Sequence, residues 1–215
     1  MEDMEDEEKA ERAKGKWNKS GTAGLRSYLN EDVVNTQKAE ENTGSGTKPI
    51  ADLFPETTIM FADISGFTAW SSTREPSQVF TLLEAIYADF DAIAKRRHVF
   101  KVEVVGDCYV AVAGLPDPRP DHALVMAKFA YDCLNKMGEV IHKLEVELGP
   151  DTAELSLRVG LHSGPVVAGV LRGDKSRFQL FGDTVSIFCR QCLDVAIFKH
   201  MVAHFLFFSQ FLKHR

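Results

Sequence analysis

VFKVEVVGDCYVAVAGLP, at residues 99–116, is the stretch of this sequence that decides the fold. It contains two β-rich runs, and Gly106-Asp107 lies between them. A Gly-Asp pair between two such runs is a strong signal for a β-hairpin. We therefore expect two antiparallel strands, with Asp107 at the tip of the hairpin.

The segments on both sides of this hairpin carry regular patterns of their own. TTIMFADI, at residues 57–64, is a compact apolar run that predicts a buried strand. A helix is predicted next, because Pro76 suits a first helical turn and a single apolar stripe follows it. The further expectations are a loop at 65–75, helices at 76–97 and 122–148, a strand at 155–171 interrupted at 162–165, and a strand at 178–185.

The order of these elements is β-α-β-β-α-β plus one strand. That order matches the ferredoxin-like, split βαβ pattern of an α+β fold. The sequence therefore predicts an antiparallel-rich sheet with helices on one face.

Length and composition limit the kind of protein. The chain of 215 residues has room for one domain of ordinary size plus tails. A net charge of −6 argues against a surface that coats nucleic acid. The four cysteines form no secreted-type framework, which favours a reducing compartment, and the polar N-terminus is not a signal peptide.

Three regions follow from composition along the chain. Residues 1–50 are polar and charged, which is typical of a disordered segment or a linker. Residues 51–185 carry the predicted elements and form the expected domain. Residues 186–215 are an atypical hydrophobic tail, and charged side chains interrupt it too often for a good membrane span.

Two carboxylates stand out by position. Asp63 ends an apolar strand, and Asp107 is at a hairpin tip that the topology places beside that strand. Two aspartates at neighbouring strand ends make a hard, all-oxygen site suited to magnesium or manganese. The alternatives are a capping or turn aspartate at 63 and an ordinary hairpin residue at 107. The loop ISGFT after Asp63 offers backbone N–H groups to phosphate oxygens, since Gly66 allows close approach.

Four separated segments together resemble one known family. FPETTIMFADISGFT, KVEVVGDCYVAVAGLP, RVGLHSGPVVAGV and FGDTV occur in the order and spacing of the class III nucleotide cyclase catalytic domain, over about residues 52 to 185. The resemblance implies a head-to-tail dimer, either a homodimer or a heterodimer with another cyclase domain, with the active site at the subunit interface. It also implies two Mg²⁺ or Mn²⁺ ions and attack of the ribose 3′-hydroxyl on the α-phosphate.

The resemblance assigns roles to particular residues. Asp63 and Asp107 match the metal-binding aspartates, and the backbone carbonyl of Ile64 matches a further metal contact. The backbone amides of the following loop match the triphosphate-binding segment, which consists of Ser65, Gly66, Phe67 and Thr68.

Base recognition in the family depends on two positions. Glu103 matches the residue that is Glu in guanylate cyclases and Lys in adenylate cyclases, and a carboxylate accepts hydrogen bonds from guanine N1–H and its amine. Gln179 occupies the position that is usually Cys in guanylate cyclases and Asp or Thr in adenylate cyclases. A Gln amide serves either base, so Glu103 favours GTP and Gln179 leaves ATP open.

The family pattern changes after FGDTV. Ser186 takes the position of the Asn that orients the ribose, and Arg190 takes the position of the Arg that stabilises charge on the α-phosphate. The residues around Arg190 depart from the pattern, so this match is weak. GTA-AGT, which encodes Val-Ser, also spells a common splice donor, so we interpret the tail that follows Val185 as translated intron or a gene-model artefact.

Three functions are compatible with these features. The first is a nucleotide cyclase that makes cyclic GMP, or alternatively cyclic AMP. The second is a non-catalytic cyclase-like partner, because the second half-site is missing. The third is another phosphoryl transferase with two aspartates on a related fold. The resemblance places such a domain in the cytoplasm, or at the cytoplasmic face of a membrane within a larger receptor.

Overall fold

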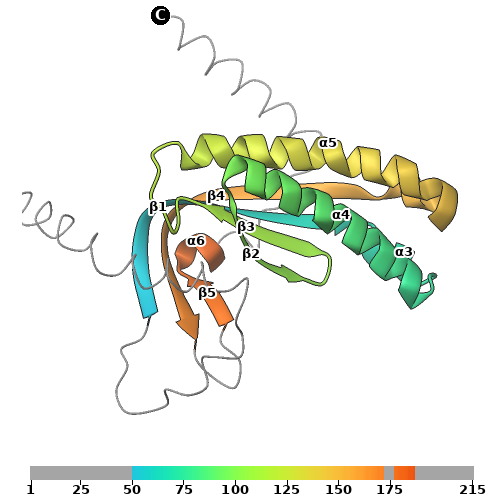
Figure 1. Cartoon of the computed structure of the whole chain (residues 1–215). Helices are drawn as coiled ribbons and strands as arrows, with labels where there is room; N and C mark the ends of the chain where they lie inside the picture. The colour runs from blue at the N-terminus through green and yellow to red at the C-terminus, as the bar shows by residue number, and fades with distance from the viewer. Residues whose placement is uncertain (1–49, 172–176, 187–215) are drawn as a thin grey trace, which may run out of the picture.

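The computed structural model describes residues 50–171 and 177–186, and it contains a five-stranded antiparallel sheet (Figure 1). The strand order is β2-β3-β1-β4-β5. The elements are β1 (Ile50–Ser65), α3 (Phe67–Ser71), α4 (Pro76–Arg97), β2 (Phe100–Val105), β3 (Cys108–Ala113), α5 (His122–Leu148), the 3₁₀-helix η2 (Pro150–Glu154), β4 (Ser156–Leu171), β5 (Arg177–Phe181) and α6 (Asp183–Ser186). The predicted α+β fold is confirmed.

The hairpin and the two long helices have the bounds that local signals predict. Val105 pairs with Cys108, which leaves Gly106 and Asp107 as the two-residue turn, and Gly106 has the positive φ of 62° that such turns use. Helix α4 begins at Pro76, where a proline needs no hydrogen-bond partner for its nitrogen. It ends at Arg97, because His98 adopts a left-handed conformation with φ 54°.

Helices α4 and α5 lie side by side over one face of the sheet (Figure 1). Their apolar stripes and the inward side chains of the strands form the larger core. The rings of Tyr109 and Phe90 meet edge to face, with centroids 5.5 Å apart. The largest fully buried side chains of this core include Tyr109, Phe90, Phe129, Met60, Ile64, Leu82, Ile86 and Met126.

A second apolar cluster lies on the other face of the sheet. Its buried members include Phe54, Ile59, Val110, Val112, Val166 and Ala168. The sheet curls enough for its two edge strands to meet, since the rings of Phe100 on β2 and Phe178 on β5 are 5.1 Å apart. Helix α6 is held against β4 by the Thr184 hydroxyl, which donates to the Pro165 carbonyl at 2.7 Å.

Strand β4 differs from the prediction at residues 162–165, where an interruption was expected. The strand is continuous, so that expectation was wrong. A bulge in the β1–β4 ladder is the reason: Phe54 pairs with Val166, and the next pair is Thr57 with Gly164. Pro165 lies at this irregularity, where a missing N–H costs no ladder hydrogen bond. Strand β1 also continues through the bulge, so it is longer than residues 57–64.

Two other boundaries also differ from the prediction. Residues 65–75 were expected to be a loop, but they include helix α3, whose Trp70 side chain is buried. The strand expected at 178–185 begins at Arg177 and ends at Phe181, because Gly182 has φ 136° and α6 follows. The regions predicted as linker and tail lie outside the described residues, apart from Ile50 and Ser186 at their inner ends.

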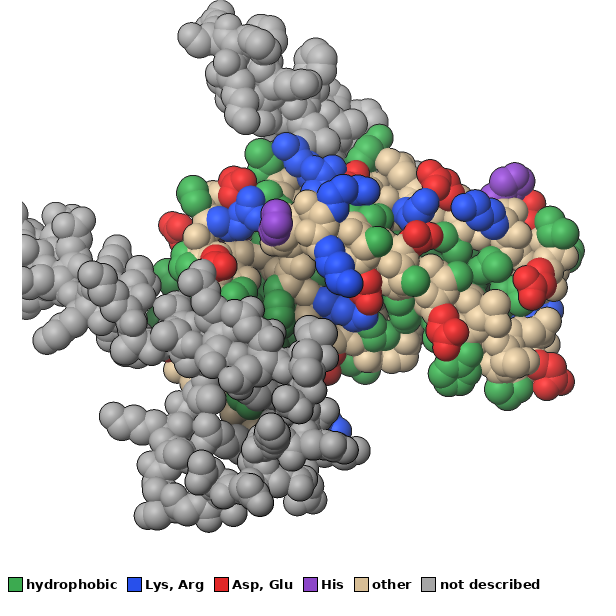
Figure 2. All heavy atoms as spheres, viewed as in Figure 1, with side chains coloured by type: hydrophobic (Ala, Val, Ile, Leu, Met, Phe, Trp, Pro, Cys, Tyr) green, Lys and Arg blue, Asp and Glu red, His purple; other side chains and the backbone are tan. Residues whose placement is uncertain are grey.

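Charged side chains of both signs cover the outer surface of α4 and α5 (Figure 2). Arg96 and Arg97 both pair with Asp132, and Lys136 pairs with Glu139. These pairs remain in contact with solvent, and surface pairs contribute little to stability. No helix within residues 50–171 and 177–186 combines the length and hydropathy of a membrane-crossing segment.

Candidate active site

The ends of three neighbouring strands bring Asp63 and Asp107 together. Asp63 is near the end of β1, where it pairs with Cys108 of β3 on one side and Arg158 of β4 on the other. Asp107 directly precedes Cys108 at the hairpin tip. The carboxyl groups of Asp63 and Asp107 are close enough to interact. The topology therefore produces the pair of carboxylates that the sequence predicts.

The electrostatics of this pair favour a bound cation. Burial is the largest influence on the pKa of Asp107, and it raises that pKa. The charge of Asp63 raises it further, while a backbone hydrogen bond and the nearby Arg158 act in the opposite direction. Two partly buried carboxylates that repel each other gain most when a positive charge lies between them.

Arg158 is a further candidate site residue, which the sequence did not predict. Its Nε donates to Asp63 Oδ2 at 3.0 Å, and its Nη2 contacts the same oxygen. The side chain stays partly exposed, so the guanidinium borders both the carboxylate pair and solvent. Alternation along residues 155–161 hints at an outward-facing Arg158, but only the β1–β4 register places it beside Asp63.

The site suits a hard divalent cation. Carboxylate oxygens are the ligands that Mg²⁺ and Mn²⁺ prefer, and Mg²⁺ keeps several waters or phosphate oxygens around one or two carboxylates. Within the described part of the chain, no cluster of three or more His, Cys, Asp and Glu side chains is present. The Ile64 side chain is apolar and buried in the core. The backbone carbonyl is therefore the only oxygen that this residue offers beside Asp63.

Tyr87 of α4 lies against the turn that carries Asp107. Its hydroxyl donates to the Gly106 carbonyl at 3.3 Å. Burial raises the pKa of Tyr87, and the acidic neighbours Asp107, Cys108 and Asp63 raise it further. The hydroxyl therefore stays protonated and holds the turn from the helix side.

The loop after Asp63 leaves the sheet at Gly66. This residue has φ 85°, a left-handed conformation that glycine adopts without strain. Ser65 still pairs with Ser156 of β4, whereas Thr68 is already in α3 and exposed. The predicted phosphate-binding residues Ser65 to Thr68 thus begin two residues beyond Asp63.

The two predicted base-recognition residues lie on different faces of the sheet. Glu103 on β2 is exposed and pairs with Val110, whose side chain belongs to the second apolar cluster. Alternation puts Asp63 on this same face. Gln179 pairs with Gly169 between Phe178 and Leu180, so it points to the opposite face. Of the two predicted base-recognition residues, Glu103 is therefore the one on the same face of the sheet as Asp63 within one chain.

Comparison with known proteins identifies the family. The model of the "Adenylate and Guanylate cyclase catalytic domain" family matches residues 51–192, which is more than half of the chain. The chain belongs to this family.

Relatives of this cyclase domain carry names of both nucleotide classes. It is 42% identical over 136 residues to the receptor-type guanylate cyclase gcy-28 of Caenorhabditis elegans, covering 63% of this chain and 10% of that protein. It is 37% identical over 141 residues to an adenylate cyclase of Mycobacterium bovis, covering 66% and 30%. The chain thus spans less than a third of either relative.

A solved structure also matches this cyclase domain. The dimeric guanylyl cyclase domain of the RhoGC fusion protein from the aquatic fungus Blastocladiella emersonii superposes with a TM-score of 0.57 at 38% sequence identity. The match covers 66% of this chain and 76% of that one. At 38% sequence identity, the two chains are similar in sequence as well as in fold.

The residues predicted to form the second half-site fall at the limit of the described residues. Ser186 is the last residue of α6, which follows β5 and packs on β4. Arg190 lies outside the described residues. The structure therefore describes the geometry around Asp63 and Asp107, but not the geometry around Arg190.

Proposed function

We propose that this cyclase domain converts GTP to cyclic GMP and pyrophosphate in cyclic-nucleotide signalling. The observation that carries the proposal is the cluster of Asp63, Asp107 and Arg158 at three neighbouring strand ends. It joins a pair of cation-binding carboxylates to a partly exposed guanidinium, as a metal-bound triphosphate requires.

Each residue of the metal half has a distinct task in this proposal. Asp63, Asp107 and the Ile64 carbonyl hold two Mg²⁺ or Mn²⁺ ions. When bound, the ions ease loss of the ribose 3′-hydroxyl proton and stabilise charge that develops on the phosphates. Arg158 exchanges its contact with Asp63 for phosphate oxygens, which a guanidinium binds in a bidentate manner.

The loop after β1 holds the triphosphate. Backbone N–H groups of Ser65, Gly66, Phe67 and Thr68 donate to phosphate oxygens. The left-handed Gly66 lets the chain turn away from the sheet directly after the aspartate. The backbone N–H groups and the turn at Gly66 together keep the α-phosphate near Asp63 and Asp107.

Glu103 selects the base. Its carboxylate is exposed on the face that carries Asp63, where it accepts hydrogen bonds from guanine N1–H and the exocyclic amine. Adenine has no matching pair of donors on that edge. Gln179 contributes less to base selection, because it points to the other face of the sheet within this chain.

The working unit is a head-to-tail dimer, in which a second cyclase domain completes each site. Ser186 and Arg190 stand at the positions of the ribose-orienting Asn and the phosphate-stabilising Arg. Serine is too short to replace that Asn. A heterodimer whose partner supplies an intact second half-site is therefore more active than a homodimer of this chain. The unit works in the cytoplasm, or at the cytoplasmic face of a membrane as part of a larger protein.

Two alternatives differ from this proposal in a single feature. An adenylate cyclase would use ATP, which Gln179 would accommodate. A non-catalytic partner would bind metal and nucleotide without turnover, which the serine at position 186 favours. Both alternatives keep the roles of Asp63 and Asp107.

A complementation assay tests the proposal. The purified chain is given GTP or ATP with Mn²⁺, alone and mixed with a related intact cyclase that carries alanine in place of both metal-binding aspartates. We expect little product from the chain alone and cyclic GMP from the mixture. Cyclic AMP in the mixture would support the adenylate alternative. No product in any mixture would overturn the proposal of an active metal half.

A further inference from the structure

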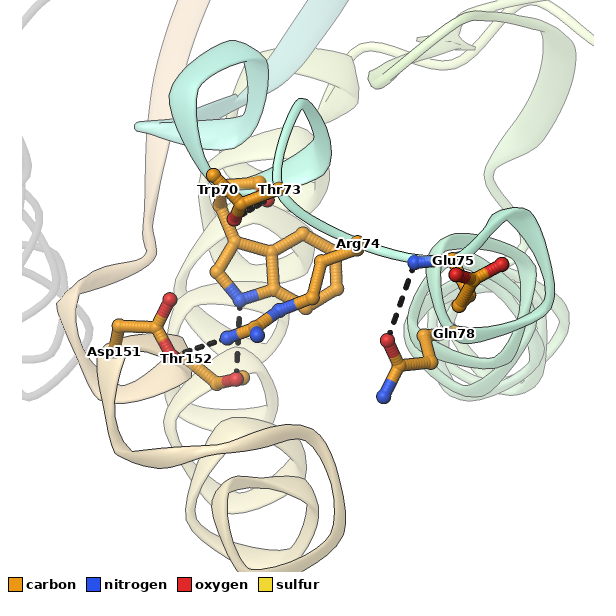
Figure 3. A network of polar contacts seen from close by, with 7 residues as sticks. All are labelled: Trp70, Thr73, Arg74, Glu75, Gln78, Asp151 and Thr152. Atoms are coloured by element: carbon orange, nitrogen blue, oxygen red, sulfur yellow. Dashed lines mark hydrogen bonds and ion pairs between the residues drawn. The ribbon is translucent and has the colours of Figure 1, made fainter.

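A network of side chains joins the α3–α4 connection to η2 at the end of the sheet that carries the phosphate loop (Figure 3). Trp70 and Arg74 come from one segment, and Asp151 and Thr152 come from a segment about eighty residues away in sequence. We call these four residues the Trp70 network. None of them belongs to the site described above.

Trp70 is the centre of this network. Its indole is buried and its Nε1–H donates to the Thr152 hydroxyl at 3.1 Å, where Thr152 is also fully buried. The Phe67 ring stacks on Trp70 with centroids 6.3 Å apart. The indole therefore ties the first turn of α3 to η2 by packing and by one specific hydrogen bond.

Arg74 covers the indole from the other side. Its guanidinium carbon is 5.2 Å from the centroid of the Trp70 ring, and the group pairs with Asp151. Only 17% of the Arg74 side chain is exposed, so this cation–π contact is largely shielded from water. Gly149 makes room for it, because a Cβ there would come within 3.1 Å of Arg74 Nη2.

The network connects the two chain segments that form the phosphate end of the site. Trp70 is four residues after Gly66, and its backbone N–H donates to the Gly66 carbonyl at 3.0 Å. Thr152 is followed by Leu155, which lies under Gly66, and then by Ser156, which pairs with Ser65. The Trp70 network thus holds both α3, which follows the loop, and the start of β4, which pairs with the residue before Gly66.

We propose that Trp70 and Arg74 are positioning residues for triphosphate binding, acting through the backbone of Ser65 to Thr68. This inference rests on the proposed function, because it assigns the loop to the triphosphate. The network fixes where the loop leaves the sheet, so its amides stay aligned beside Asp63 without a conformational cost on binding. Neither residue touches the nucleotide.

Binding of manganese with 3′-deoxy-GTP, which lacks the attacking hydroxyl, measures the effect without turnover. Calorimetry compares the chain with Trp70→Phe, which keeps an aromatic ring but removes the N–H donor, and with Thr152→Val, which removes the acceptor at similar volume. Each change removes one hydrogen bond, so we expect the Kd of the nucleotide to rise about three- to tenfold. The double variant should match either single variant, because both lose the same bond.

Two controls separate positioning from general destabilisation. Arg74→Gln should weaken binding of 3′-deoxy-GTP, whereas Arg97→Gln, which breaks an ion pair to Asp132 on the outer helix surface, should not. Binding of Mn²⁺ alone should stay within about twofold in all variants, because the carboxylate pair is intact. Amide hydrogen exchange at residues 65–69 should accelerate in the network variants and not in Arg97→Gln.

Separate outcomes bear on the two proposals. Unchanged nucleotide affinity in Trp70→Phe and Thr152→Val, or an equal loss in Arg97→Gln, would overturn the positioning role while leaving the proposed function intact. Failure of the unmodified chain to bind manganese with 3′-deoxy-GTP, even when it is mixed with the intact cyclase that carries alanine at both metal-binding aspartates, would overturn the proposed function and the inference with it.

Discussion

At the scale of single residues, the site depends on which side chains surround Asp63. In this structure its partner is Arg158, and Asp107 approaches from the hairpin. The proximity of the two aspartates was predictable, because Asp63 is near the end of β1 and Asp107 is in the hairpin turn. Arg158 was not, because its position beside Asp63 depends on a strand pairing across about ninety-five residues of chain.

Asp107→Asn and Arg158→Gln should affect different ligands: the first should weaken binding of Mn²⁺, and the second should weaken binding of 3′-deoxy-GTP. Asp107→Asn removes a charge that a divalent cation needs, so Mn²⁺ binding should weaken by at least about 10- to 100-fold, the loss that follows removal of even an outer-shell partner of a metal ligand. Arg158→Gln should leave Mn²⁺ binding unchanged or stronger, since it frees Asp63, but should weaken binding of 3′-deoxy-GTP. Calorimetric titration of both ligands checks this. Equal effects of both variants on Mn²⁺ would contradict the separate roles.

Glu103→Lys tests base selection. A lysine ammonium cannot accept from guanine N1–H or its amine, so the ratio of kcat/KM for GTP over ATP should fall by about tenfold or more, the value of one or two lost charged hydrogen bonds. The complementing mixture described above provides the turnover. An unchanged preference for GTP would remove Glu103 from the site, and Glu84→Lys on the outer side of α4 is a matched control for charge.

At the scale of elements, helix α4 braces the hairpin that carries the site. Asp91 accepts from the Tyr109 hydroxyl and from Lys101 Nζ, each at 2.8 Å. Burial raises the pKa of Tyr109, so its hydroxyl remains a donor. The Lys101 ammonium also lies 5.3 Å from the centroid of the Tyr109 ring. One carboxylate therefore joins α4, β2 and β3.

Asp91→Ala should destabilise the domain by about 1–3 kcal/mol, because it leaves the buried Tyr109 hydroxyl without an acceptor. Asp132→Ala is the matched control: it removes another half-buried carboxylate with two donors, but its partners Arg96 and Arg97 both reach solvent, unlike the buried Tyr109. We expect a loss below about 1 kcal/mol there. Denaturant unfolding measures the free energy of unfolding of both variants. Similar losses would contradict the proposed role of Asp91 in joining α4 to the hairpin.

The sequence predicted elements whose signals are local. Pro76 and the periodic apolar stripe set α4, and Gly106-Asp107 set the hairpin. The continuous β4 was missed because Pro165 normally ends a strand, and only the pairing with β1 shows that a bulge accommodates it. Helix α3 was missed because its stability comes from Trp70 contacts with distant residues. Non-local contacts account for these two errors.

At the scale of the whole molecule, one tight backbone contact joins the end of β3 to its neighbour β1. Gly114 follows β3 with φ 100°, and a Cβ there would lie 2.4 Å from the Glu56 carbonyl oxygen. This contact lies beside the bulge that shifts the β1–β4 register. The hairpin, the bulge and the second apolar cluster therefore depend on one another.

Gly114→Ala should reduce the free energy of unfolding by about 3 kcal/mol or more, because it combines a strained φ with a backbone clash. Gly138→Ala is the matched control, since a methyl group on this helical glycine would have nothing within 4 Å. There we expect a gain of roughly 0.5–1 kcal/mol from helix propensity. Thermal and denaturant unfolding measure both. A small loss at position 114 would show that β1 can shift away.

Trp70 also gives this domain an optical reporter beside the loop proposed to bind the triphosphate. The chain has two tryptophans, and the other, Trp17, lies outside the described residues. In a Trp17→Phe variant, fluorescence would come from one shielded indole beneath a guanidinium. Its emission should be blue-shifted relative to a tryptophan in water. A shift on addition of nucleotide would follow the loop in real time, before any product forms.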